Sequence, residues 1–245
     1  MIGFAAVGIA GVLVVASSER DPSRNSPPAA PERQWDGRSP LRCGGNERVT
    51  GSGLTATFES GPAIHAEGEC EVRLRDVNVS GPTGIVAAGS AQVIVHTGVL
   101  QVRDVAADAR DRASVRLSRL VVIGLDDGPS SPGVGLRLSG SARATLEGGS
   151  VGANRGIDAS GSSQLRLHGT TLQAAEVGIA ARGDSLLTLD GAEVRASGVG
   201  VRLEGNAHGS VIGMGVIEGA PVALDGQGLE LNEFVELIDN SAGQF

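Results

Sequence analysis

The chain contains the sequence Leu165-Arg166-Leu167-His168, then Leu172, then Gly178-Ile179-Ala180-Ala181-Arg182-Gly183. The next residues repeat this unit as Leu187-Thr188-Leu189-Asp190, then Val194, then Gly200-Val201-Arg202-Leu203-Glu204-Gly205. The two copies superimpose at an offset of 22 residues, from position 165 to position 187. A fixed period of roughly 20–50 residues is typical of a solenoid, in which each copy forms one turn and stacks on its neighbours.

The same unit recurs along most of the chain. Each copy opens with an apolar-x-apolar triplet, at Val72/Leu74, Val93/Val95, Val115/Leu117, Ala144/Leu146, Leu165/Leu167 and Leu187/Leu189. Each copy closes with an apolar residue, a small or apolar residue and then Gly, at Ile64/Ala66/Gly68, Ile85/Ala87/Gly89, Leu136/Leu138/Gly140, Ile157/Ala159/Gly161, Ile179/Ala181/Gly183, Val201/Leu203/Gly205 and Val222/Leu224/Gly226. The openings lie 21, 22, 29, 21 and 22 residues apart. Equivalent residues therefore recur at the same position of every copy.

The alternation within each copy predicts strands. Polar residues such as Arg166 and Thr188 separate the apolar ones, which is the period of 2 of a half-buried strand and not the 3.6 of a helix. Gly, Asp and Asn at the strand ends predict tight turns. Stacking the copies about 4.8 Å apart would align inward ladders such as Leu146-Leu167-Leu189. The sequence thus predicts an all-β fold, a single-stranded right-handed parallel β-helix of about 8 rungs of about 22 residues each.

Two other folds with this element content fit less well. A β-sandwich does not require one phase at 21 to 22 residues in every copy. Leucine-rich repeats have the period but need a helical segment that these copies lack. Residues 49–230 instead resemble the right-handed parallel β-helix repeat family, the fold shared with pectate lyases. The resemblance implies the fold and is nearly silent on activity, because the chain lacks the catalytic pattern of those enzymes.

Composition divides the chain into four segments. Residues 1–18 are apolar and uncharged, which predicts a signal peptide or a transmembrane anchor. Residues 19–41 are rich in Pro, Ser and Arg, which predicts a disordered linker. We expect the β-helix over 42–230 and a C-terminal cap or tail over 231–245. Within the helix, the rung that opens at Val115 carries extra residues between Ile123 and Gly135, and the charged stretch 103–112 fits the repeat poorly.

The cysteines bear on the cellular compartment. Cys43 lies just before the first rung and Cys70 near its end, so one turn of the helix could bring them side by side. In an exported chain the natural interpretation is a disulfide, which would stabilise the fold by roughly 3 kcal/mol, with two buried thiols as the alternative. We expect an exported protein of bacterial type, membrane-anchored, periplasmic or extracellular.

Composition also excludes several functions. The formal net charge is −8 and no strongly basic stretch is present, which argues against nucleic acid as a partner. All 20 basic residues are Arg. The absence of Lys excludes a Walker A loop, a Schiff-base enzyme and a protein kinase.

Few residues are candidates for chemistry, and the sequence predicts no catalytic residue, metal ligand set or cofactor. The string 148–152 around Ser150 matches a nucleophile elbow, but it falls on a rung turn and not between a strand and a helix. His96 and His168 share one template position three rungs apart, about 14 Å, too far to share a metal. Asp126 and Asp127 in the predicted projecting loop could contribute to a cation site, or they could simply be solvated.

The expected role is therefore a non-enzymatic one. We expect an exported or membrane-anchored β-helix that acts as a rigid structural or interaction module at the cell envelope. Its partner would be a cell-surface protein or a glycan, and the membrane itself if residues 1–18 are not cleaved. Two alternatives are a degenerate carbohydrate-active enzyme or carbohydrate binder, and a self-assembling β-helix scaffold.

Overall fold

The computed structural model describes residues 30–124, 133–213, 215–220, 224–225, 229–231 and 235–239 of the 245-residue chain. Every regular element within these ranges is a β-strand. The strands are β1 (Glu32–Gln34), β2 (Leu41–Cys43), β3 (Arg48–Thr57), β4 (Pro62–Ala66), β5 (Glu71–Ala87), β6 (Gln92–Ala109), β7 (Ser114–Gly124), β8 (Val134–Leu138), β9 (Arg143–Ala159), β10 (Gln164–His168), β11 (Thr171–Gly183), β12 (Leu186–Asp190), β13 (Glu193–Gly205), β14 (His208–Ile212), β15 (Gly215–Ala220), β16 (Leu224–Asp225), β17 (Leu229–Leu231) and β18 (Val235–Asp239).

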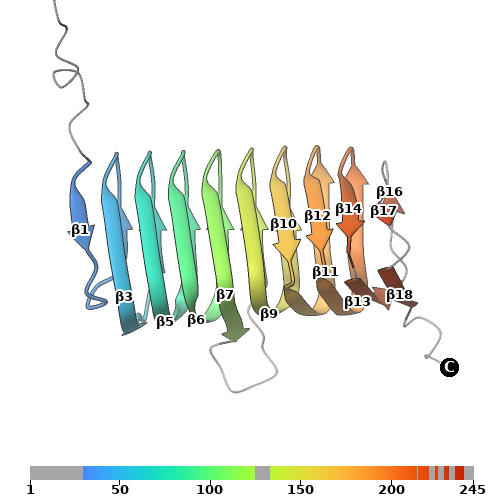
Figure 1. Cartoon of the computed structure of the whole chain (residues 1–245), viewed down its shortest axis with the longest axis horizontal. Helices are drawn as coiled ribbons and strands as arrows, with labels where there is room; N and C mark the ends of the chain where they lie inside the picture. Colours follow the sequence, from blue (N-terminus) through green and yellow to red (C-terminus); the bar gives the residue numbers. More distant parts are fainter. Residues whose placement is uncertain are drawn as a thin grey trace, which may run out of the picture.

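These strands form one parallel β-helix of about eight turns (Figure 1). All the strand pairings are parallel, and each strand pairs with the equivalent strand of the next rung. Leu167 pairs with Leu146 on one side and Leu189 on the other, as the repeat predicts. The fold class predicted from the sequence is thereby confirmed.

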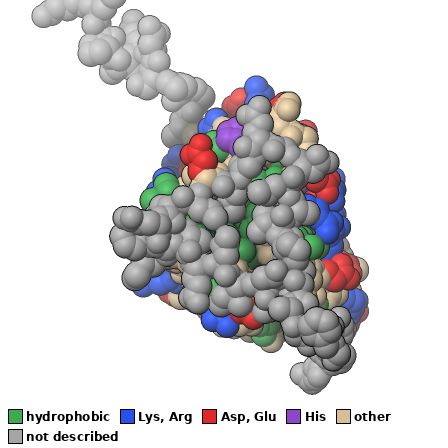
Figure 2. All heavy atoms as spheres, turned by 90° about the vertical axis from the view of Figure 1, so that its right-hand side faces the viewer, with side chains coloured by type: hydrophobic (Ala, Val, Ile, Leu, Met, Phe, Trp, Pro, Cys, Tyr) green, Lys and Arg blue, Asp and Glu red, His purple; other side chains and the backbone are tan. Residues whose placement is uncertain are grey.

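The core is built from stacked aliphatic side chains. Leu146, Leu167 and Leu189 are 3 %, 0 % and 1 % exposed, whereas the intervening Arg166 has 59 % of its side chain exposed. Seen along the long axis, charged side chains lie on the rim of the cross-section (Figure 2). Period-2 alternation therefore decides which residues face inward.

Glycine is required where successive rungs approach most closely. A Cβ at Gly178 would lie 2.4 Å from the carbonyl oxygen of Gly200 and 2.6 Å from a methyl group of Val194. Gly156, one rung earlier, would meet Gly178 in the same way, at 2.4 Å. Side chains at these positions would separate the rungs or displace the core, so this column consists of small residues.

Two boundaries differ from those expected. Within the predicted linker, Glu32–Gln34 form strand β1, which pairs with β3. Trp35 is buried and stacks on Phe58 with ring centroids 6.5 Å apart, because its aromatic surface covers the N-terminal end of the core. At the other end, β17 and β18 continue the parallel pairing with β14 and β15 beyond residue 230. The expected segment 1–18 and the linker up to residue 29 lie outside the described residues.

The charged stretch 103–112 contains the expected irregularity, because the register of β6 against β5 shifts between Val102 and Val105. Residues 105–109 of β6 pair in register with β8. Asp108 is only 3 % exposed there, and Arg110 pairs with it at 2.6 Å. The Asp108 carboxylate raises the pKa of Arg110 through a hydrogen bond and charge attraction. An arginine partner thus lets a carboxylate occupy a buried position in the strand.

Cys43 and Cys70 form a disulfide with a Cα–Cα distance of 5.9 Å, as the sequence predicts. Both residues are buried in the core. Cys43 ends β2 in the first turn, and Cys70 directly precedes β5. The bond therefore links the N-terminal end of the β-helix to the next turn. In the part of the chain that the structure describes, no helix has the length and hydrophobicity needed to span a bilayer.

Candidate functional site

The strand segments that open each rung share an outer surface, which we call the opening face. It consists of three outward rows that run along the helix axis between β3 and β14. The rows are Arg48-Glu71-Gln92-Ser114-Arg143-Gln164-Leu186-His208, Thr50-Arg73-Ile94-Arg116-Thr145-Arg166-Thr188-Ser210 and Ser52-Arg75-His96-Ser118-Glu147-His168-Asp190-Ile212. The strand register alone places these residues side by side.

The opening face is basic although the chain is acidic. The whole chain carries 28 acidic and 20 basic residues. In the three rows above, the arginines are Arg48, Arg73, Arg75, Arg116, Arg143 and Arg166, whereas the acidic residues are Glu71, Glu147 and Asp190. The charge of this face is thus opposite in sign to that of the molecule, which favours negatively charged ligands at this surface.

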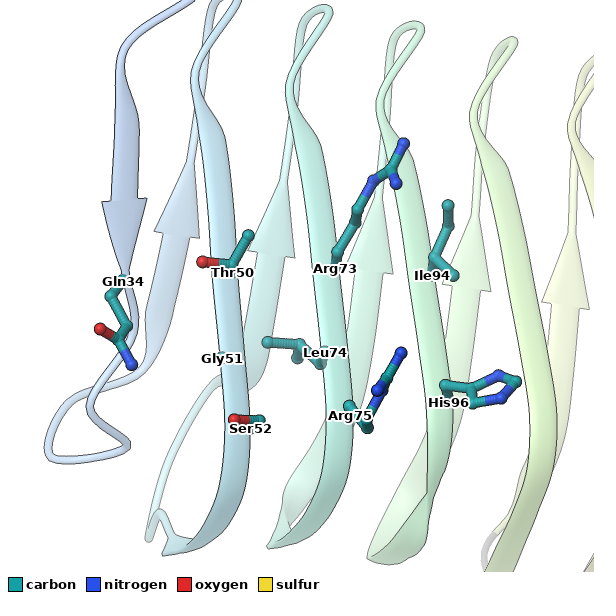
Figure 3. Close-up of a pocket in the computed structure, with 9 residues that line it drawn as sticks. All are labelled: Gln34, Thr50, Gly51, Ser52, Arg73, Leu74, Arg75, Ile94 and His96. Carbon is teal, nitrogen blue, oxygen red and sulfur yellow. The ribbon is translucent and has the colours of Figure 1, made fainter.

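An open pocket of about 470 Å³ lies at the N-terminal end of the opening face (Figure 3). It spans β1, β3, β5 and β6. Its lining residues are Gln34, Thr50, Gly51, Ser52, Arg73, Leu74, Arg75, Ile94 and His96. Thr50, Arg73 and Ile94 occupy one row, and Ser52, Arg75 and His96 the next. Pockets of this volume accommodate small molecules.

Arg73 and Arg75 point outward from the same strand but differ in their partners. Arg73 pairs with Glu71, which also accepts a hydrogen bond of 2.8 Å from Arg48. Burial alone would raise the pKa of Glu71, but the hydrogen bonds from Arg73 and Arg48 outweigh it, and the pKa lies below its ordinary value. Arg75 has no ion pair or side-chain hydrogen bond with any described residue. Arg75 is exposed, and its side chain extends towards His96 of the next rung (Figure 3).

His96 is held by an arginine from the next rung. The Nη2 atom of Arg119 lies 3.3 Å from Nε2 of His96. Arginine can only donate, so Nε2 is the acceptor in this contact. Arg119 itself has a φ of 51°, in the left-handed region that side chains other than glycine rarely adopt. The backbone at Arg119 is therefore strained in the position from which its side chain reaches His96.

Further along the opening face, arginines are neutralised by acidic residues of the next rung. Arg116 of β7 pairs with Glu147 of β9, and Ser118 donates a hydrogen bond of 3.0 Å to the same carboxylate. The hydrogen bond from Arg116 is the main cause of a lowered pKa for Glu147. Asp190 similarly lies 3.6 Å from Arg166 and 3.0 Å from His168. These contacts join rungs through their side chains.

The structure places the residues singled out in the sequence as follows. Ser150 lies within β9, and His96 and His168 lie three rungs apart in one row. Asp126 and Asp127 lie outside the described residues. Among the described residues, no group of three or more His, Cys, Asp or Glu side chains could hold a metal ion.

The pocket was not identified in the sequence. Its residues come from four strands and form no linear motif. One signal was present: Ser52, Arg75 and His96 occupy the same template position in successive rungs, so stacking the copies would have placed them side by side.

The side chains in the pocket are suited to binding. Guanidinium groups remain protonated and present several donors in a planar fork that matches carboxylate and phosphate oxygens. Hydroxyl and amide groups of Thr50, Ser52 and Gln34 add further hydrogen-bonding groups. No family model matches the chain, and neither the curated proteins nor the solved structures contain a match.

Proposed function

We propose that the chain is a non-enzymatic, exported β-helical module that binds a ligand or partner through its opening face. In this proposal the helix is of the right-handed, pectate-lyase-like type, without the catalytic pattern of those enzymes. Residues 1–18 would direct export or hold the protein at the envelope. The observation that carries the binding role is the arginine-rich opening face on a chain of net charge −8.

The disulfide supports export. Structural disulfides persist in oxidising compartments and are rare in the cytosol. Cys43 and Cys70 are both buried within the core, where the bond is protected from solvent and serves a structural role. A protein that depends on this bond is suited to the periplasm or the cell exterior.

The regular strand register supports a role in binding. Each backbone group along the opening face pairs with equivalent groups of the adjacent rungs, so the side chains of the three rows have fixed spacings. A surface with fixed spacings loses little conformational entropy when a ligand binds. The arginines cannot exchange protons near neutral pH, which favours binding and orientation of a ligand over general acid–base chemistry.

Export is tested by fractionating cells that express the full chain in an export-competent bacterial host. Thiols are titrated in each fraction with and without reductant. The proposal expects the protein in the envelope or medium, with no free thiol before reduction and two afterwards. Two free thiols in a soluble cytosolic fraction would contradict export and would favour an intracellular scaffold.

Binding through the opening face is tested by charge reversal. The variant Arg75→Glu/Arg143→Glu changes two exposed arginines of this face that have no carboxylate partner among the described residues. The control Arg112→Glu changes an exposed arginine outside the face. We expect only the double variant to lose retention of the protein on isolated envelopes. Equal retention of both variants would place the binding surface elsewhere.

A further inference from the structure

We infer that the pocket around Arg75 is a binding site for an oxyanion group, a phosphate, sulfate or carboxylate, carried by a small ligand. The inference names the ligand class of the opening face and therefore rests on the proposed function. It is carried by three independent observations: the free guanidinium group, the composition of the lining, and a local departure from the glycine pattern of the rung corners.

The first observation is that Arg75 lacks the neutralisation found around it. Arg48 and Arg73 share Glu71, Arg116 has Glu147, and Arg166 has Asp190. Carboxylates of the same rung or of an adjacent rung thus pair with four of the six arginines of the opening face. On either side of Arg75 in its own row lie Ser52 and His96, neither of which carries a carboxylate. Its charge remains available to a ligand.

The second observation is that no carboxylate lines the pocket. The lining contributes the guanidinium groups of Arg73 and Arg75. Gln34, Thr50, Ser52 and His96 add hydrogen-bonding groups. Apolar surface comes from Ile94, which lies in the row of Arg73, and from Leu74, at the position between Arg73 and Arg75. An anion with an organic body fits this lining, because the charged part can contact Arg75 while the uncharged part lies against Ile94. A cation would meet only repulsion from the arginines.

The third observation concerns the corner that follows the opening face. In most rungs the corner residue is a glycine with positive φ: Gly53, Gly148, Gly169, Gly191 and Gly213. In three successive rungs it is instead Asp76, Thr97 or Arg119, with φ of 52°, 66° and 51°. For the β-branched Thr97 this is a strained conformation.

The strained corners coincide with the pocket. Asp76 follows Arg75, and Thr97 follows His96. Arg119 reaches back across one rung to His96. Strained backbone conformations are concentrated at functional sites. There the function of a side chain offsets the stability that glycine at the same position would provide. We therefore assign Arg119 as a positioning residue that orients His96 at the edge of the pocket.

An oxyanion is the chemical group that these residues recognise. The planar guanidinium of Arg75 can donate two parallel hydrogen bonds to a carboxylate, phosphate or sulfate. The pocket, about 470 Å³, holds one such group with a small organic body and not an extended polymer. Its open side would leave that body partly solvated (Figure 3).

The test is a titration of the purified, oxidised full chain at a constant ionic strength of about 0.15 M, which screens weak non-specific attraction. Inorganic phosphate, sodium sulfate and sodium acetate are added in separate arms against sodium chloride. Binding is followed by the side-chain Nε–H signals of the arginines in nitrogen-15 spectra. We expect a saturable shift of the Arg75 signal in at least one arm, and the arm that saturates first identifies the oxyanion.

The variant Arg75→Gln should weaken this binding about tenfold or more, as expected for loss of a hydrogen bond to a charged group. Arg112→Gln makes the same change of net charge at an exposed arginine outside the opening face, and its affinity should equal that of the original chain. The absence of saturation in all arms, or equal affinities of the two variants, would overturn the inference.

The variant Arg119→Gly separates positioning from structural support. Glycine relieves the strained φ, so the melting temperature should rise by about 2 °C or more. The same change removes the contact with His96, so the affinity for the oxyanion should fall. A lower melting temperature, or a higher one with unchanged affinity, would contradict the positioning role.

Cell fractionation and thiol titration test export separately, so failure of the oxyanion site and failure of export are distinguishable.

Discussion

Two adjacent residues of β10 show how strictly the rung register assigns side chains to the inside or the outside. Leu167 is fully buried between Leu146 and Leu189. Arg166 points outward and makes only an exposed ion pair, 3.6 Å from Asp190. One position along the strand therefore separates an apolar environment from solvent.

We predict that Leu167→Asp lowers the free energy of unfolding by about 3–5 kcal/mol, because it leaves an unpaired carboxylate in the core. Arg166→Asp introduces the same group on the surface and should cost under about 1 kcal/mol, since exposed ion pairs contribute little. Urea unfolding followed by circular dichroism measures both. Similar losses at the two positions would be inconsistent with the register.

The inward and outward positions could be predicted from the sequence because the alternation Leu165-Arg166-Leu167 is local. The corner at Thr97 could not be predicted. Turn preferences favour glycine at positive φ, and the sequence carries no local sign that Thr97 adopts a φ of 66°. Asp108 could not be placed either, because its burial depends on Arg110 and on Arg137 of a different strand, 4.0 Å away.

At the scale of the element, rungs are joined by side-chain contacts as well as by backbone pairing. Glu147 of β9 accepts hydrogen bonds from Arg116 and Ser118 of β7. The pKa of Glu147 is lowered, mainly by Arg116, and the pKa of Glu47 is lowered, mainly by Arg33. Because these carboxyls bind protons more weakly in the folded chain than in the unfolded one, stability depends on pH.

We predict that the free energy of unfolding decreases as the pH falls below about 4.5. A lowered pKa contributes stability that is fully present above the unfolded value and is lost as the pH falls through the folded value. Glu147→Gln should cost under about 1 kcal/mol at pH 7, because the pair is partly exposed. Its difference from the original chain should shrink towards pH 3.

The measurement is a set of urea unfolding curves between pH 3 and pH 7 for three proteins. The original chain should show the steepest decline. Arg116→Gln removes the donor instead of the carboxylate and should flatten the curve as Glu147→Gln does. A Glu147→Gln variant that keeps the full decline would show that this contact does not contribute to the acid sensitivity.

The pocket illustrates what the sequence leaves open at this scale. The outward positions of Arg73 and Arg75 follow from strand alternation. Whether a hollow remains between them depends on where the side chains extend. Arg73 pairs with Glu71, whereas Arg75 has no ion pair with a described residue. The repeat predicts the rows. That Arg75 has no ion-pair partner could be recognised only from the side-chain contacts in the structure.

At the scale of the whole molecule, the β-helix is nearly one-dimensional, because each rung contacts mainly its neighbours (Figure 1). Stability in such a fold is approximately a sum over rungs and the interfaces between them, and the terminal rungs are the most prone to open. Two features stabilise the N-terminal end against local unfolding. Trp35 and Phe58 cover the core, and the disulfide joins Cys43 to Cys70.

We predict that the disulfide stabilises the N-terminal rungs more than the rest of the helix. The bond closes a loop with a sequence separation of 27, for which the chain-entropy model gives about 3–4 kcal/mol. The double variant Cys43→Ala/Cys70→Ala should lose about this amount in the opening free energy of β2–β4. The amides of β12 and β13 should change much less, because several rung interfaces separate them from the bond.

Native-state hydrogen exchange distinguishes this local effect from a global one. In the double variant, the amides of β2–β4 should exchange faster by a factor of about 100 or more, the equivalent of the loop-closure term. Alanine is matched in size to the small residues that follow Cys70 in its column, Ala91 and Ala113, so the variant should still fold. A uniform acceleration along the whole chain would mean that the β-helix unfolds as one cooperative unit, and the disulfide would then stabilise every rung equally.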